Sequence, residues 1–113
     1  MKRVKRPWGH YIIIHKSKNY LIKKIVILPN ESISLQLHHH RSEHWIVING
    51  IAKIQIGNKK IKLTQNQSTY VPVNKKHKVS NNSSEPLIIL ETQLGQKLSE
   101  KDIIRFEDQY NRS

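Results

Sequence analysis

Apolar and polar residues alternate along much of the chain with the period expected of β-strands. Alternation is strict over residues 33–38 and returns over 51–56, and β-branched residues dominate 20–28. Turn-forming pairs such as Asn49-Gly50 and Gly57-Asn58 separate these segments, and the second pair is typical of a hairpin. The expected strands cover residues 20–28, 33–38, 45–48, 51–56, 60–63, 69–71 and 87–90. Short strands about ten residues apart predict one all-β domain over residues 1–113, built as a sandwich or barrel.

One short helix is expected near the C-terminal end. Ser99 and Asp102 have the spacing of residues that cap a first helical turn, and Ile103-Ile104-Arg105-Phe106 follows directly. The chain contains no repeat, no low-complexity segment and no linker. The prediction is therefore a β-domain with a short C-terminal helix.

Composition narrows the functional classes. The 113 residues include no cysteine, which excludes disulfides, cysteine-based zinc fingers and thiol catalysis. No apolar run approaches the roughly 18 residues of a membrane span. The basic residues at the start lead into Pro7-Trp8-Gly9 rather than into an apolar secretory segment. We therefore expect a cytoplasmic protein without a membrane partner.

The formal net charge is +12, from 20 Lys and Arg against 8 Asp and Glu. These positive residues are scattered, and no nucleic-acid-binding motif accompanies them. The charge therefore predicts a solvated surface that attracts small anions such as sugar phosphates, and no specific nucleic-acid partner.

The segment from Ile33 to His40 carries donor groups on one face. In an extended strand Ser34, Gln36 and His38 point the same way as His40. A polar face in water is the ordinary interpretation, but a surface strand more commonly carries Lys, Thr and Glu than imidazoles. If both faces are covered, the polar face must line a site, because buried imidazoles and amides need partners.

Two stretches resemble the two motifs of the cupin family, which hold a metal inside a small β-barrel. The first motif typically reads Gly, five residues, His-x-His, three or four residues, Glu, six residues, Gly, and it falls on Asn30, Gln36, His38, Glu43 and Gly50. The second ends in Pro-x-Gly-x-x-His, three residues, Asn, and it falls on Asn66, Pro72, Asn74, His77 and Asn81. Asn tolerates the left-handed backbone that Gly otherwise supplies, so Asn30, Asn66 and Asn74 are compatible with the turns. The resemblance implies a double-stranded β-helix, or jelly-roll-like, barrel.

By this resemblance the metal ligands are Gln36, His38, Glu43 and His77. Gln36 is the weakest donor, because a neutral amide oxygen is a poorer ligand than imidazole. A second register with His38, His40, His44 and His77 keeps the His-x-His spacing and stays open, although we favour the first. The mixed nitrogen and oxygen donors suit a divalent Zn, Fe, Mn, Co or Ni ion and do not choose among them.

The resemblance is closest to the type II mannose-6-phosphate isomerase cupin. It is carried by residues 6–9, 34–45, 66–72 and 102–110 and extends to Arg112. That domain usually forms the C-terminal part of a bifunctional mannose-1-phosphate guanylyltransferase/mannose-6-phosphate isomerase, whose Gly-rich phosphate loop is absent from these residues. The resemblance implies a stand-alone isomerase domain that interconverts mannose 6-phosphate and fructose 6-phosphate through an enediol(ate).

This reaction needs a group that moves a proton between C1 and C2. Glu43 is expected to be either a metal ligand or the base. If Glu43 binds the metal, His40 or His44 is the better candidate for the base, because an imidazole titrates near neutral pH.

The hexose 6-phosphate substrate also needs a cation. Arg41 is expected to bind a substrate oxyanion or the phosphate and to take part in catalysis, because it is always charged and follows the histidine tract directly. Arg105 is a second candidate for the phosphate. The alternative for Arg105 is an ion pair with Glu107 or Asp108.

Two other functions stay open at this point. One is a non-catalytic sugar-phosphate-binding cupin that works with a separate guanylyltransferase, and the other is a different cupin enzyme that modifies sugars. The block from Gln36 to Trp45 favours the isomerase over the second of these. A homodimer is the expected assembly, because a second copy can bury exposed sheet edges.

Overall fold

The chain is almost entirely β-structure. The computed structural model describes residues 2–107, which form eleven strands and no helix. Their bounds are β1 Arg3–Arg6, β2 Gly9–Lys16, β3 Tyr20–Ile27, β4 Leu35–Leu37, β5 Ser42–Asn49, β6 Ala52–Ile56, β7 Lys59–Leu63, β8 Ser68–Val71, β9 His77–Ser80, β10 Leu87–Leu94 and β11 Ile104–Glu107. Nothing in this range is therefore a helix suited to crossing a membrane. The all-β prediction is confirmed.

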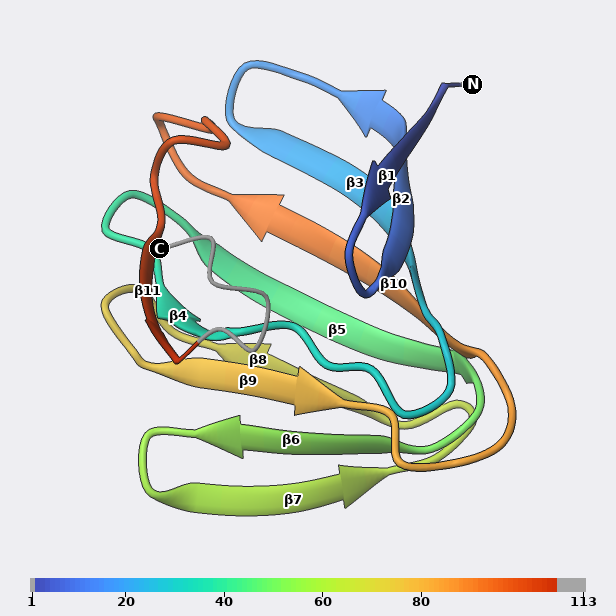
Figure 1. Ribbon diagram of the computed structural model, residues 1–113. Coiled ribbons are helices and arrows are strands. Elements are labelled where there is room, and N and C mark those ends of the chain that lie inside the picture. Colours follow the sequence, from blue (N-terminus) through green and yellow to red (C-terminus); the bar gives the residue numbers. More distant parts are fainter. Residues whose placement is uncertain (1, 108–113) are drawn as a thin grey trace.

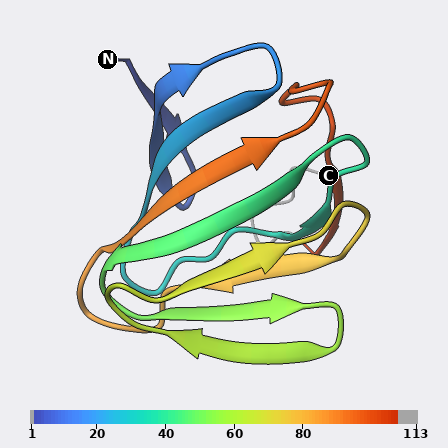
Figure 2. The same cartoon turned by 180° about the vertical axis from the view of Figure 1, so that it is seen from behind.

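The strands form two antiparallel sheets. Six strands pair in the order β1-β2-β3-β10-β5-β8, and five pair in the order β11-β4-β9-β6-β7. Neighbours such as β3 and β10, or β4 and β9, come from distant parts of the sequence. Figures 1 and 2 show the two sheets from opposite sides, with β11 beside β4. This is the jelly-roll-like arrangement that the sequence predicted.

The inner face of the six-stranded sheet changes from apolar to polar along its length. On β3 the buried Lys23 lies between Ile25 and Leu21, and on β10 the buried positions change from Ile89 to Glu91. The antiparallel registers place Lys23 opposite Glu91 on β10, and Glu91 opposite Trp45 on β5. Directly paired residues project from the same face of a sheet, so buried polar groups from neighbouring strands gather in one part of the barrel.

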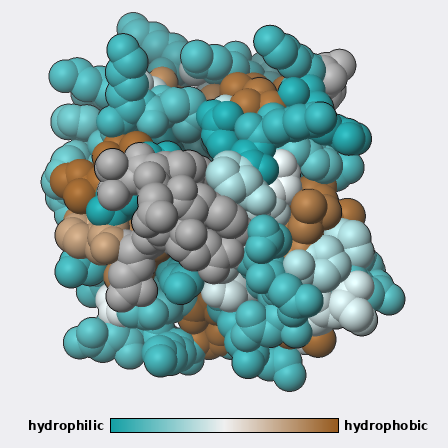
Figure 3. Space-filling view, viewed as in Figure 1, coloured by the Kyte–Doolittle hydropathy of each residue, from teal (hydrophilic) through white to brown (hydrophobic). Residues whose placement is uncertain are grey.

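The outside of the barrel carries most of the charge. Exposed lysines such as Lys53, Lys60 and Lys62 lie on β6 and β7. Figure 3 shows a largely hydrophilic face on which hydrophobic residues form small, separate groups. Lys23 and Arg41 differ from these surface residues, because both are buried inside the barrel.

Three asparagines occupy turn positions with a left-handed backbone, which glycine adopts most readily. Asn30, Asn66 and Asn74 have φ angles of +63°, +73° and +62°. The prediction that Asn tolerates a left-handed backbone at these positions is confirmed. Asn74 also holds the site together, because its N–H donates to His38 O at 2.9 Å and its Oδ1 accepts from His39 Nδ1 at 2.7 Å.

The predicted C-terminal helix is wrong. Ser99 does begin a turn, since its Oγ accepts from the N–H of Lys101 and its carbonyl accepts from the N–H of Asp102, both at 3.1 Å. The chain then extends as β11, which pairs with β4. A partner strand from elsewhere in the sequence therefore overrides the local capping signal.

The segment between β10 and β11, residues 95–103, crosses the histidine tract, and we call it the strap. A Cβ on Gly95 would lie 2.1 Å from His40 O and 3.1 Å from Arg41 Cα. Only glycine fits so close an approach. The strap is therefore positioned directly over the residues that follow β4.

Candidate metal centre

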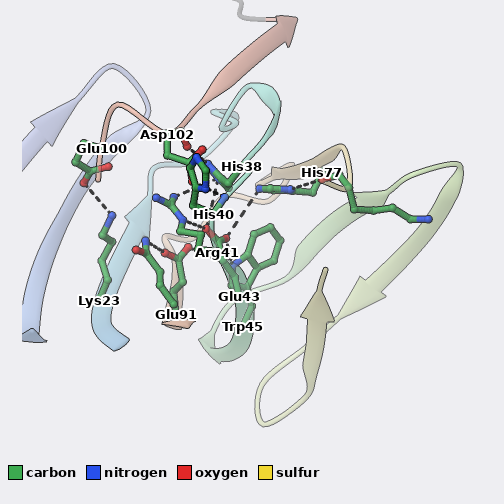
Figure 4. A network of polar contacts seen from close by, with 12 residues as sticks. Lys23, His38, His40, Arg41, Glu43, Trp45, His77, Glu91, Glu100 and Asp102 are labelled. Atoms are coloured by element: carbon green, nitrogen blue, oxygen red, sulfur yellow. Dashed lines mark hydrogen bonds and ion pairs between the residues drawn. The ribbon is translucent and has the colours of Figure 1, made fainter. Parts of the chain in front are cut away.

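Two imidazoles and one carboxylate meet among the buried polar groups. His38 follows β4, Glu43 lies on β5 and His77 begins β9, and all three are buried. One donor atom from each residue lies within 4.8 Å of the other two. His38 Nε2 is 3.4 Å from one oxygen of Glu43, and His77 Nε2 is 3.9 Å from the other. Figure 4 shows both rings close to the Glu43 carboxylate.

Backbone carbonyls fix both imidazole rings. His38 Nδ1 donates to Asp102 O at 2.5 Å, and His77 Nδ1 donates to Lys75 O at 2.9 Å. A carbonyl only accepts, so each Nδ1 carries the proton and each Nε2 keeps its lone pair. Metal-binding histidines are oriented in this way in many proteins. Three groups that donate electron pairs therefore face one another, an arrangement that suits a bound metal ion.

His38 has the charge state that binding a cation requires. Burial, and after it the guanidinium of Arg41, lower the pKa of His38 to about 4. The imidazole is therefore neutral at pH 7, which is the form that binds metals.

Arg41 ties this cluster to the strap. Its Nε donates to Glu43 Oε2 at 2.7 Å, its Nη2 donates to His38 Nε2 at 3.2 Å, and its Nη1 donates to Ser99 O at 3.3 Å. Burial acts to lower the pKa of Arg41, but the carboxylates of Glu43 and Glu91 raise it. Arg41 therefore stays charged, and a metal bound by His38 would replace one of its hydrogen bonds.

Gln36 is placed beside His77. The two residues are directly paired between β4 and β9, so their side chains project from the same face. Gln36 is buried and lines the same cavity as His38 and Glu43. Its amide forms no hydrogen bond within the described part of the chain. The structure therefore brings together all four residues of the first register.

A cavity of about 80 Å³ adjoins the cluster. One water needs about 10–15 Å³ of such volume, so the cavity holds several. Ser34 Oγ is buried in its lining and has no hydrogen-bond partner among residues 2–107. Buried hydroxyls are normally paired, so this one indicates a polar occupant. The donor set, the ring orientations and this hydroxyl all fit a metal with a polar ligand.

A second buried carboxylate, Glu91, lies close to Glu43. Trp45 Nε1 donates to Glu43 Oε1 at 3.0 Å and to Glu91 Oε2 at 3.1 Å, and Gln93 Nε2 donates to Glu91 Oε1 at 2.6 Å. Burial raises the pKa of Glu91, and the negative charge of Glu43 raises it further. Glu91 lines the cavity without belonging to the three-residue cluster.

His40 and His44 lie outside the cavity lining. The regular strand ends at Leu37 and the chain bends, so the alternation that predicted His40 beside His38 stops there. His40 is exposed, and that prediction is wrong. His44 is exposed on β5, where its ring lies 4.8 Å from that of Tyr70. The second register is not brought together.

Arg105 and Trp45 both line the cavity. Arg105 reaches it from β11, opposite Gln36 on β4. Its alternative ion pair with Glu107 or Asp108 stays a prediction, because Asp108 lies outside the described residues. The ring of Trp45 lies 5.5 Å from that of His77, so Trp45 forms part of the cavity wall.

Five cavity residues with polar side chains were not identified from the sequence: Arg6, Tyr11, Lys23, Glu91 and Glu100. Only Glu91 had a local signal, because it continues the alternation of Leu87 and Ile89 beyond the predicted strand. Lys23 and Lys24 are adjacent on β3, and the sequence does not show which of them faces inward. Glu100 reaches the cavity through the path of the strap alone.

Comparison with known families agrees with this geometry. The family described as mannose-6-phosphate isomerase C-terminal matches residues 1–108. The chain is 45% identical over 112 residues to the xanthan biosynthesis protein XanB of Xanthomonas campestris pv. campestris (strain B100), covering 99% of this chain and 24% of that protein. It is 40% identical over 111 residues to the mannose-1-phosphate guanylyltransferase ManC of Salmonella typhimurium, covering 98% and 23%. The chain thus spans about a quarter of the length of these relatives.

Solved structures share the fold. A protein from Klebsiella pneumoniae with a double-stranded β-helix domain superposes with a TM-score of 0.76 at 19% identity, over 93% of this chain and 91% of that one. The cupin domain of Schizosaccharomyces pombe Cnp3 superposes with a TM-score of 0.73 at 9% identity, over 76% and 64%. At such low identities the likeness shows a cupin fold and nothing about activity.

Proposed function

Since this cupin chain belongs to the mannose-6-phosphate isomerase C-terminal family, we propose that it is a metal-dependent isomerase that interconverts mannose 6-phosphate and fructose 6-phosphate. The observation that carries the proposal is the convergence of three buried electron-pair donors beside a polar cavity. An aldose–ketose isomerase needs a cation at C1 and C2, a proton-transfer group and a cation for the phosphate. The chain offers candidates for each.

His38, Glu43 and His77 are proposed to hold a divalent ion, with Gln36 as the fourth ligand. When bound, such an ion supplies a Lewis acid that polarises the carbonyl and stabilises the charge of the enediolate. Zn, Fe, Mn, Co and Ni remain alternatives, because the donors do not choose among them.

The proposed role of Arg41 is to position these ligands and to balance negative charge. It donates to Glu43 and to His38, and it stays charged. A substrate oxyanion that forms beside Glu43 would lie near this guanidinium, which favours a contribution to catalysis. Arg41 is less suited to the phosphate, because its donors are engaged within the protein.

Glu91 is proposed as the group that moves the proton. With Glu43 on the metal, and His40 and His44 outside the cavity lining, Glu91 is a buried carboxylate left in the cavity for this task. Its raised pKa suits it, because a carboxyl group that titrates closer to neutral pH both accepts and returns a proton readily. The proton would pass from one of C1 and C2 to Glu91 and then to the other carbon.

The biological setting is part of the proposal. The relatives are named for xanthan biosynthesis and for mannose-1-phosphate guanylyl transfer, so we place the chain in the supply of activated mannose for polysaccharide biosynthesis. We propose that it forms one domain, acts as a homodimer and works in the cytoplasm.

The test is a coupled isomerase assay on the purified chain, loaded in turn with each divalent metal. Turnover of mannose 6-phosphate that a chelator abolishes is the expected result. A folded, metal-loaded protein that converts no hexose 6-phosphate would contradict the proposal and favour a binding protein that works with a separate guanylyltransferase.

The ligand register has its own test. The metal content of Gln36→Ala is expected to fall, whereas that of His44→Ala should equal the wild type, because His44 is exposed on the outside of β5. Metal loss in the His44 variant alone would overturn the first register.

A further inference from the structure

Lys23 is a buried cation that no step described so far uses. Its side chain is 7% exposed, and it lies on β3, opposite Glu91. Its ammonium lies 4.1 Å from the centre of the Tyr11 ring and pairs with Glu100 Oε1 at 3.1 Å. A buried ammonium is costly without anionic partners, so its position needs an explanation.

The partner of Lys23 is unlike the other carboxylates of the cavity. Glu43 and Glu91 are buried on strands of the sheet, whereas the side chain of Glu100 is 53% exposed and belongs to the strap. The strap is held by Arg41 and by Asp102, which accepts from the backbone N–H groups of His39 and His40 at 2.8 and 2.9 Å. Glu100 can therefore leave Lys23 by moving at the surface, without any change in the sheet.

Tyr11 and Arg6 lie beside Lys23, and we call these three residues the cradle of the Glu100 carboxylate. Tyr11 forms a hydrogen bond with it, and burial together with this bond raises the pKa of Tyr11 to about 12, so the hydroxyl remains a donor. Arg6 Nη2 donates to the same hydroxyl at 3.4 Å, and its guanidinium lies 5.2 Å from the Tyr11 ring centre. The cradle therefore offers two cations and one hydroxyl to a single anionic group.

The cradle lies on the Lys23 side of the cavity, away from His77. Figure 4 shows Lys23 and Glu100 on one side of Arg41 and His77 on the other. Successive strands of a sheet lie about 4.8 Å apart, so the two strand spacings from β3 to β5 place the backbones of Lys23 and Trp45 about 10 Å apart across the sheet. A hexose 6-phosphate carries its phosphate on C6 and reacts at C1 and C2, so a phosphate subsite is expected at some distance from the metal.

We propose that Lys23, Tyr11 and Arg6 form the subsite that binds the phosphate of the substrate. Glu100 occupies this subsite as an internal anion, and the phosphate displaces it. This inference rests on the proposed function for the identity of the sugar phosphate, and it assigns to Lys23 the phosphate contact that the sequence suggested for Arg41 or Arg105. Lys is suited to the role, because it contacts phosphate as a point charge with three donors.

The test measures binding of inorganic phosphate, mannose 6-phosphate and mannose by titration calorimetry to the metal-loaded protein. Lys23→Gln is expected to weaken binding of both phosphate compounds by about tenfold or more, with metal content unchanged. The control is Lys24→Gln, which removes the same charge from the opposite face of β3 and should bind as the wild type does. In turnover, Lys23→Gln should raise KM and leave kcat nearly unchanged.

Glu100→Gln provides a second test that keeps Lys23 in place, in case the buried lysine is needed for folding. It is expected to bind phosphate several-fold more tightly, because no internal carboxylate competes. Weaker phosphate binding in this variant, or unchanged binding in folded Lys23→Gln, would overturn the inference. If the wild type binds phosphate through Lys23 but turns over no hexose 6-phosphate, only the isomerase proposal fails. If it turns over mannose 6-phosphate and Lys23→Gln has an unchanged KM, only this inference fails.

Discussion

At the scale of single residues, chemistry in this protein depends on which polar side chains are buried. Glu43, Glu91 and Lys23 lie at buried positions of strands whose inner faces also carry apolar residues. Burial makes each charge costly, so each has partners, and those partners in turn decide orientation and protonation. The same residue types on the outer face would be ordinary solvated side chains.

Replacing Glu91 separates proton transfer from metal binding. Glu91→Gln keeps the size of the side chain and one oxygen that can accept from Trp45 or Gln93, but it cannot accept a proton. We expect kcat for isomerisation to fall by about 10²- to 10⁴-fold with metal content unchanged. Glu85→Gln, an exposed carboxylate in the loop before β10, serves as the control. A wild-type kcat in Glu91→Gln would exclude it as the proton-transfer group.

Asn66 allows the cost of a left-handed residue to be measured without disturbing the site. Its φ is +73°, and its exposed side chain makes no hydrogen bond within residues 2–107. Asn66→Ala is expected to lower the free energy of unfolding by about 1 kcal/mol, whereas Asn66→Gly should be nearly neutral. Urea denaturation measures both, with Gln65→Ala in the same turn as the control. Equal stability of the Ala and Gly variants would contradict this account of the turn.

At the scale of elements, the strap gives the site its final form. It carries Glu100 to Lys23, Ser99 O to Arg41 and Asp102 to the histidine tract. The tract has left its regular strand after Leu37, so contacts with the strap and with Asn74 fix its path. A helix at this point would have withdrawn the strap from these contacts.

The Asp102 carboxylate is therefore expected to support metal binding without touching the metal. It accepts hydrogen bonds from the backbone N–H groups of His39 and His40. Burial acts to raise the pKa of Asp102, but these hydrogen bonds outweigh it, so the pKa is lowered. Asp102→Ala removes both bonds and should weaken metal affinity by about 10- to 100-fold, as loss of outer partners does elsewhere. Competition with a chromophoric chelator measures the affinity, and Lys101→Ala on the exposed neighbour is the control. Identical affinities in the two variants would show that the strap does not order His38.

At the scale of the whole molecule, the two sheets divide tasks between their faces. The facing sides enclose the core and the cavity, and the outer side of the six-stranded sheet exposes Ile46, Ile48, Tyr70 and Leu94. We call these four residues the outer patch. Apolar residues grouped on one sheet face are commonly buried by a second copy of the chain.

The proposed homodimer is expected to use the outer patch. Ile46→Lys places a charge there and should shift the protein from dimer to monomer in sedimentation velocity, with metal content unchanged. Leu28→Lys, at an exposed apolar residue outside the patch, should leave the assembly as it is in the wild type. A wild-type protein that sediments as a monomer at all concentrations tested would refute the dimer, and a dimeric Ile46→Lys would exclude this patch as its interface.

The sequence by itself indicated seven of the eleven strands of residues 2–107, several turns and most of the donor set, but not β1, β2, β9 and β11. Alternation with a period of two indicates which face of a strand is buried, and Asn or Gly at a turn indicates a left-handed backbone. Both features depend on residues that are close together in the sequence. The resemblance to the two cupin motifs further implied His38, Glu43 and His77, whose side chains the structure places together.

Only the tertiary structure decided which polar residues share the cavity. Lys23 rather than Lys24 faces inward, Glu91 lies opposite it, and the strap brings in Glu100, none of which follows from neighbours in the sequence. The bend after Leu37 turned His40 out, and pairing with β4 made a strand of the expected helix. These outcomes depend on hydrogen bonds between segments about 60 residues apart, whose energies outweigh the local preferences that a sequence displays.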